Sequence, residues 1–320
     1  MKTFFIRGLI FIAFGYAFLF FFYNYFLTGH DDEKYLIKKY LKNKDKIAAI
    51  AIGTSHIWGL NFKSIGLEGI ALGVGGRDLT ECKYILKFLL DQKNNSVKKV
   101  FISIGYFSLY QDNYSPDGTV SDTRAFMYNN IPSWKMVSHD YKNYILGKFL
   151  PFIQSDHWRI IAIKFFKKLH FKFMNINTPE EHFKDTVIEG HSKMIPLKEV
   201  EARVESQHQI HKRALKNNDY YTKAHSLEVL KEIISMLKKD NIELILFTPP
   251  YYYKYTELYN KEYIDEMKSE MKHIVDRYGV KYLDFSLDPE FIYNPNYFED
   301  SDHINLEASK RLGEKIHSVL

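Results

Sequence analysis

The chain has 320 residues, which is enough for one large α/β domain with an insertion or for two smaller domains. Hydrophobic residues make up 46% of the chain and charged residues 26%, so the sequence can build a packed core and global disorder is excluded. The net charge of +5 is modest, and the basic residues are scattered among acidic ones, which does not favour nucleic acid as a partner.

The N-terminal segment is strongly apolar. Residues 8–29 carry no charge and are long enough to span a bilayer as a helix. Lys2 and Arg7 precede this run, which favours a cytoplasmic N-terminus and an exported remainder. We expect residues 1–30 to be a transmembrane signal anchor, because no A-x-A-like cleavage site follows; a cleaved signal peptide is the alternative. The charged residues 31–45 predict a stalk or a short helix that leads out of the membrane.

From residue 46 onward, short apolar runs alternate with stretches of helical periodicity. Strands joined by helices imply right-handed crossovers and a parallel sheet with helices on both faces. We therefore expect residues 46–320 to form a flavodoxin-like three-layer α/β sandwich with a five-stranded parallel sheet. The expected strands are 46–53, 68–73, 98–105, 242–249 and 280–286, and the expected helices are 77–92, 226–241, 262–279 and 305–320.

Residues 110–225 interrupt this alternation and are rich in Tyr, Phe, Lys and His. We expect them to form a mainly helical insertion. Within it, residues 145–174 mix aromatic and basic side chains. Such a mixture is compatible with an interfacial helix or with a face that docks a partner. A helical cap packed on the sheet is the commoner explanation.

No motif for a metal or another cofactor stands out, and we expect neither. Cys82 is the single cysteine, so it has no partner for a disulfide or a CxxC site, and we expect it in the core. His208 and His211 are three residues apart, but no further ligand completes a metal site at a recognisable spacing. We expect these two histidines to be solvated.

The first strand is followed by Gly53-Thr54-Ser55-His56. A serine at a strand-to-helix turn places its hydroxyl at the carboxyl edge of the sheet, where ligands of such folds bind. Its backbone N–H then points into the same cavity, near a helix N-terminus. Taken alone, the motif is equally explained as an ordinary helix N-cap.

The last expected helix is preceded by Asp300-Ser301-Asp302-His303-Ile304-Asn305. An aspartate three residues before a histidine can accept a hydrogen bond from the imidazole Nδ1–H, which leaves Nε2 free to take a serine proton. Asp302 is the alternative acceptor, but its adjacency to His303 predicts that it points elsewhere. Helix capping again explains these residues if they are taken alone.

Glycines follow the second expected strand in the segment from Ala71 to Gly76. Glycine lets a backbone N–H approach a ligand without interference from a Cβ atom, although a tight strand–helix turn needs the same residues. The G-x-G-x-x-G spacing of a dinucleotide site is absent.

Together, these three motifs resemble the blocks of the SGNH (GDSL-like) hydrolase superfamily. Its G-D-S block is matched by Gly53-Thr54-Ser55, and its oxyanion-glycine turn by residues 71–76. Its D-x-x-H block is matched by residues 300–303. The resemblance covers both ends of the α/β domain but not the insertion.

The resemblance implies a Ser-His-Asp triad and an acyl-enzyme intermediate. Ser55 would be the nucleophile, His303 the base and Asp300 the residue that orients His303. The backbone N–H groups of Ser55 and Gly76 would bind the oxyanion.

One block departs from the superfamily, because Phe107 stands where an asparagine usually helps to hold the oxyanion. A missing asparagine, a Thr before the serine, an N-terminal anchor and a large insertion resemble a subset that includes the teichoic-acid D-alanylation protein and the alginate and peptidoglycan O-acetylation proteins. That subset implies an extracytoplasmic O-acyltransferase or esterase acting on an acylated cell-envelope glycan. Its partner would be a multi-pass membrane acyltransferase. The alternative is a non-catalytic glycan-binding or scaffolding module of such a complex.

Overall fold

The computed structural model describes residues 2–26, 32–73, 76–111 and 220–320, together with residues 145, 149, 198, 201, 204, 205 and 208. The chain divides into two compact units. Most of the expected insertion, 110–225, and most of its segment 145–174 lie outside the described residues. The first unit comprises Met1–Tyr35 and Pro116–Phe183, and the second comprises Leu36–Ser115 and Lys184–Leu320.

The apolar N-terminal run forms helix α1, Lys2–Phe26. Its segment Thr3–Phe21 has a mean hydropathy of 2.1, and none of it is buried inside the protein. Among the described residues, this is the one helix that is long and apolar enough to cross a membrane, a property that a signal sequence shares.

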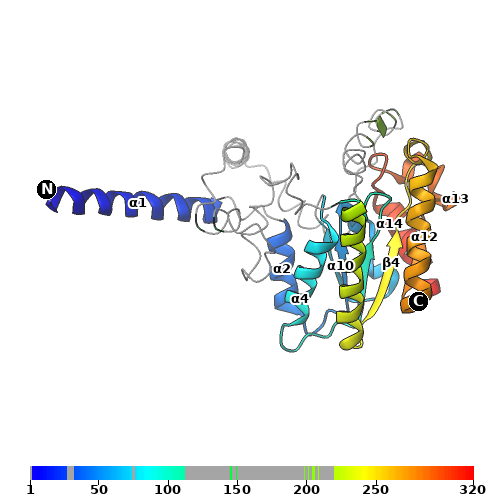
Figure 1. Ribbon diagram of the computed structural model, residues 1–320, viewed down its shortest axis with the longest axis horizontal. Helices are drawn as coiled ribbons and strands as arrows, with labels where there is room; N and C mark the ends of the chain where they lie inside the picture. Colours follow the sequence, from blue (N-terminus) through cyan, green and yellow to red (C-terminus); the bar gives the residue numbers. More distant parts are fainter. Residues whose placement is uncertain are drawn as a thin grey trace. The chain divides into compact units, whose positions relative to one another are not determined.

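Five parallel strands form the sheet of the second unit (Figure 1), in the order β2-β1-β3-β4-β5. From β1, the chain first adds β2 on one side and then β3, β4 and β5 on the other, as it does in flavodoxin-like sheets. The prediction of a five-stranded parallel sheet is therefore confirmed. The strands are β1 (Ala49–Gly53), β2 (Gly69–Gly73), β3 (Lys99–Ser103), β4 (Glu243–Thr248) and β5 (Lys281–Asp284).

The central strands are apolar because helices cover the sheet on both faces. Every residue of β1 is buried, and so are the four residues of β3 from Val100 onward. In the crossovers, α4 (Leu79–Leu90) contacts α10 (Tyr220–Lys239), as Figure 1 shows, and Lys223 of α10 forms an ion pair with Glu266 of α12 (Lys261–Tyr278). Right-handed crossovers place these three helices on one face.

The other face carries α3 (Phe62–Ile65), which contacts the closing helix α14 (Leu306–Val319). The four expected helices thus form, and α12 ends at Gly279, whose positive φ of 62° suits a C-cap glycine. The shorter elements are η2 (Ser55–Gly59), α11 (Tyr253–Thr256), α13 (Pro289–Ile292) and η5 (Pro295–Tyr297).

The segment predicted to be a stalk forms helix α2, Asp32–Asn43. Leu36 and Tyr40 of this helix are buried, and the Tyr40 hydroxyl donates a hydrogen bond to the carbonyl oxygen of Leu89 in α4 at 3.0 Å. From Leu36 onward, this segment is therefore packed on the α/β unit.

Candidate active site

Ser55 is positioned by a tight turn at the end of β1. Gly53 has a φ of 155°, and a Cβ atom on it would lie 2.3 Å from Oγ of Ser103, so only glycine fits there. Thr54 is extended and η2 then begins at Ser55, whose side chain is half-buried. The serine consequently lies at the carboxyl edge of the sheet, beside the point where the strand order reverses.

His303 is positioned by a turn that the side chain of Asp300 holds. Oδ1 of Asp300 accepts hydrogen bonds from the backbone N–H groups of Asp302 at 3.0 Å and His303 at 2.8 Å. The N–H of Tyr252, in the loop after β4, donates to the carbonyl oxygen of Ser301 at 3.0 Å. These bonds attach the turn to the edge of the sheet at which Ser55 lies.

The two motifs meet in space although 248 residues separate them. Oγ of Ser55 lies 2.7 Å from Nε2 of His303. Nδ1 of His303 lies 2.9 and 3.0 Å from the two carboxylate oxygens of Asp300. Two unrelated helix caps would have no reason to form this arrangement, which has the hydrogen-bond distances of a nucleophile–base–carboxylate series.

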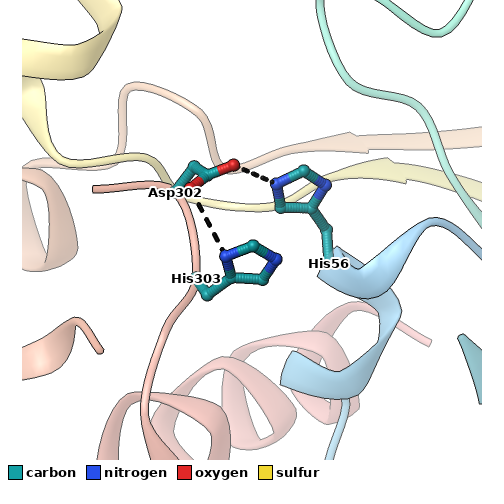
Figure 2. A group of neighbouring side chains, drawn as sticks. All are labelled: His56, Asp302 and His303. Carbon is teal, nitrogen blue, oxygen red and sulfur yellow. Dashed lines mark hydrogen bonds and ion pairs between the residues drawn. The ribbon is translucent and has the colours of Figure 1, made fainter. Parts of the chain in front are cut away.

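Asp302 also faces His303, so the expectation that it points elsewhere is wrong. Its Oδ1 lies 3.3 Å from Nδ1 of His303, and its Oδ2 lies 2.9 Å from Nε2 of His56. In Figure 2, dashed lines join the Asp302 carboxylate to both imidazole rings. The bond to His56 holds the carboxylate in this direction, and neighbouring residue numbers alone could not reveal it.

His56 is a site residue to which the sequence motif assigned no role. Its ring is stacked on that of His303, with the centroids 4.7 Å apart and the planes at 10°. Nδ1 of His56 lies 2.8 Å from the hydroxyl of Thr54. A histidine directly after the serine was visible in the sequence, but its contacts arise only when residues 300–303 fold beside it.

The two histidines have opposite pKa shifts. Burial lowers the pKa of His56 below 6.5, against the raising effect of its hydrogen bond to Asp302. Burial also lowers the pKa of His303, but the charge of Asp302 and the hydrogen bonds to Asp300 and Asp302 outweigh it and raise that pKa well above 6.5. Burial of Asp302 raises its pKa, yet the nearby His303 and His56 bring it well below 3.8.

The expected oxyanion residues are placed as follows. Gly76 has a φ of 71°, which favours glycine, and its carbonyl oxygen accepts a hydrogen bond from the Gln111 side chain. Phe107 is buried, with its ring centroid 5.8 Å from that of His56. The binding of an oxyanion by the N–H groups of Ser55 and Gly76 stays a prediction.

A metal ion would compete with hydrogen bonds that the side chains already make. His56, Asp302 and His303 each bring a possible ligand atom within 4.8 Å of the others. Both nitrogens of His56, Oδ2 of Asp302 and Nε2 of His303 already make hydrogen bonds. Away from this site, Cys82 is buried as expected. His208 is buried against Tyr259, so the expectation that it is solvated is wrong, and His211 lies outside the described residues.

Comparisons with known proteins return weak structural similarities. No family model and no curated protein matches the chain. A structure from Streptococcus pneumoniae, provisionally described as a platelet activating factor, is 11% identical, with a TM-score of 0.43 over 95% of this chain and 98% of that chain. A structure from Bacteroides fragilis, provisionally described as an acylhydrolase, is 11% identical, with a TM-score of 0.40 over 88% of this chain and 94% of that chain. The fold of this chain is defined by its own strand order, and its chemistry by its own side chains.

Proposed function

We propose that this protein is a serine enzyme of the SGNH type, an esterase or O-acyltransferase that works through an acyl-enzyme intermediate. One observation carries the proposal, the hydrogen-bonded series from Ser55 through His303 to Asp300. The half-buried Ser55 at the carboxyl edge of the sheet suits a nucleophile that must reach an external substrate.

In the proposed reaction, Oγ of Ser55 forms a bond to the acyl carbonyl carbon and passes its proton to Nε2 of His303. The N–H groups of Ser55 and Gly76 stabilise the negative oxygen of the tetrahedral intermediate. The intermediate collapses, and the leaving group takes the proton from His303. Water, or a hydroxyl group of an acceptor, then attacks the acyl-enzyme in the same manner and restores Ser55.

A fluorophosphonate probe tests the nucleophile, because fluoride leaves as Oγ bonds to phosphorus. In the full chain in detergent, we expect labelling at Ser55 that is lost in Ser55→Ala and in His303→Ala. Ser235→Ala, on the exposed side of α10, is the matched control and should be labelled like the wild type. Wild-type protein that is not labelled, or labelling that persists in His303→Ala, would contradict the proposal.

We infer further that the acyl acceptor or donor is a cell-envelope glycan and that the catalytic unit faces outward. The uncharged residues 8–29, and the positive charges of Lys2 and Arg7 that precede them, support an uncleaved anchor with this orientation. Protease added outside suitably permeabilised cells should digest the α/β unit. If the α/β unit is protected until the inner membrane is broken, it faces the cytoplasm and the proposed orientation is wrong.

The proposed substrate class is tested in the cell. A multi-pass membrane acyltransferase would deliver the acyl group, and Ser55→Ala should then lower the acyl content of the surface polymer. Acylation that is unchanged in a strain that normally acylates would exclude this substrate class while leaving the probe result intact.

A second candidate is a non-catalytic module that binds glycan or holds a membrane complex together. The observation that favours it is Phe107, which stands at the position of the superfamily's asparagine and carries no side-chain donor. Probe labelling of Ser55 that depends on His303 would exclude this candidate.

A further inference from the structure

A second histidine–aspartate pair lies against the first. The hydroxyl of Thr54, the ring of His56 and the carboxylate of Asp302 form a continuous series, with contacts of 2.8 and 2.9 Å. The side chains of His56 and Asp302 are 2% and 0% exposed, so neither can meet a substrate directly. They flank Ser55 and His303 in the sequence and touch His303 in space.

The hydrogen-bond partners determine the tautomer of His56. An ionised carboxylate only accepts hydrogen bonds, so Nε2 of His56 carries a proton and its N–H donates a hydrogen bond to Asp302. The Thr54 hydroxyl then donates to Nδ1, which completes a neutral imidazole. Burial, which lowers the pKa of His56, agrees with this neutral form.

We propose that His56 and Asp302 are positioning residues for His303, in which His56 aims the Asp302 carboxylate at Nδ1 of His303 and supports the face of its ring. This inference rests on the proposed function, since it assigns the second pair a part in the same reaction. Asp302 lies 3.3 Å from Nδ1, and the stacked rings are 4.7 Å apart.

The arrangement stabilises the imidazolium that forms when Ser55 loses its proton. The proton moves from Oγ of Ser55 to Nε2 of His303, while Nδ1–H stays between the carboxylates of Asp300 and Asp302. A second carboxylate strengthens His303 as a base, and it also raises the pH at which His303 becomes free to accept a proton. The neutral ring of His56 supports His303 without adding a like charge.

The other groups packed around the pair are uncharged at neutral pH. Tyr251, in the loop after β4, meets the His56 ring edge-on at 5.5 Å, and burial raises its pKa well above 10. Burial likewise raises the pKa of Tyr255 and of Tyr259, which also feel the charge of Asp302. The ring of Phe107 is tilted against that of His56, with the centroids 5.8 Å apart, and it is uncharged. Among the described residues, Asp300 and Asp302 are therefore the charges that face His303.

The pH dependence of probe labelling tests the role of Asp302. Asp302→Asn keeps the shape of the side chain and removes its charge. The acid limb of the pH–rate profile, where protonation of His303 stops labelling, should therefore move to lower pH by about one unit or more. Asp288→Asn is the matched control, since it removes an equal charge from an ion pair with Lys315 and should leave the limb in place. A rate that falls equally at every pH, with no displacement of the limb, would overturn the proposal.

Two substitutions test His56 separately from the stability of the fold. His56→Gln keeps an N–H donor for Asp302, whereas His56→Leu has none. Both variants are expected to fold, as checked by thermal unfolding, and His56→Gln should be labelled about tenfold faster than His56→Leu, the ratio that one buried hydrogen bond to a charge produces. Equal rates in the two folded variants would exclude the positioning role of His56.

Titration of His303 separates this inference from the proposed function. In the full chain with ¹³C-labelled histidine, the His303 resonance is the one lost in His303→Asn. One outcome is that Asp302→Asn lowers the pH midpoint of this resonance in a protein that the probe does not label. That result would support the effect of Asp302 on His303 and would contradict the proposed enzymatic function. Labelling at Ser55 with an unchanged midpoint would support the enzyme and overturn the inference.

Discussion

The two histidine–aspartate pairs use the same residue types and differ in their access to a substrate. The side chain of His303 is 19% exposed and that of Asp300 is 13% exposed, whereas those of His56 and Asp302 are 2% and 0% exposed. In the more open pair, Nε2 of His303 lies 2.7 Å from Oγ of Ser55. Exposure therefore distinguishes the pair that a ligand can reach from the pair that its neighbours enclose.

The largest expected effect on the labelling rate comes from a substitution of Asp300, in the more open pair. Asp300→Asn should slow probe labelling by about 10³-fold, because the amide no longer stabilises the imidazolium and can favour the wrong tautomer. Asp302→Asn should cost less at a pH above the acid limb, since its oxygen lies farther from Nδ1. The two labelling rates at one alkaline pH measure this difference. Equal losses would mean that the carboxylates share the role evenly.

Stability should follow the opposite order. Asp302→Ala leaves the buried Nε2–H of His56 without its acceptor and should lower the free energy of unfolding by about 3–5 kcal/mol. Asp300→Ala removes two turn hydrogen bonds from a more open site and should cost about 1–2 kcal/mol. Urea unfolding of the two variants gives both values. A larger loss for Asp300→Ala would contradict the structural role assigned to Asp302.

Acid should act on the buried pair through Asp302. Its pKa is well below 3.8 in the folded protein, so its contribution to stability is fully present above that value and is lost as the pH falls further through the folded pKa. Asp302→Asn lacks this contribution and should lose less stability than the wild type between pH about 4 and 2. Thermal midpoints measured across this range test the sign. Parallel curves for the two proteins would contradict it.

The smallest expected effect lies at the helix that follows both pairs. Asn305 caps α14 by accepting hydrogen bonds from the N–H groups of Glu307 and Ala308 at 3.1 and 3.2 Å. Asn305→Ala should lower the free energy of unfolding by about 1 kcal/mol. Urea unfolding measures this loss. A loss as large as that of Asp302→Ala would mean that the cap, and not the buried pair, holds residues 300–303.

Much of the fold follows from local pattern. The apolar runs predicted all five strands, and the periodic stretches predicted the four long helices. The two can be told apart because a buried strand and a helix with one buried face space their apolar residues differently along the sequence. The end of the first strand also predicted that Ser55 would lie at the carboxyl edge of the sheet, and the resemblance to the SGNH superfamily implied that His303 would lie beside it. Residues 110–225 offered no comparable alternation, and most of them lie outside the described part of the chain.

By itself, the sequence predicted the strand-by-strand plan, and it singled out Ser55, Asp300 and His303 through their resemblance to superfamily blocks. The structure brings these three side chains together, and their catalytic role stays a prediction. Only the tertiary structure decided that Asp302 turns toward His303, that His56 stacks on the same ring, and that His208 is buried. The direction of a side chain in a turn depends on which partners surround it. For Asp302, the deciding partner is His56, 246 residues away along the chain, and no local spacing encodes a contact that forms only when the first strand and the last loop meet.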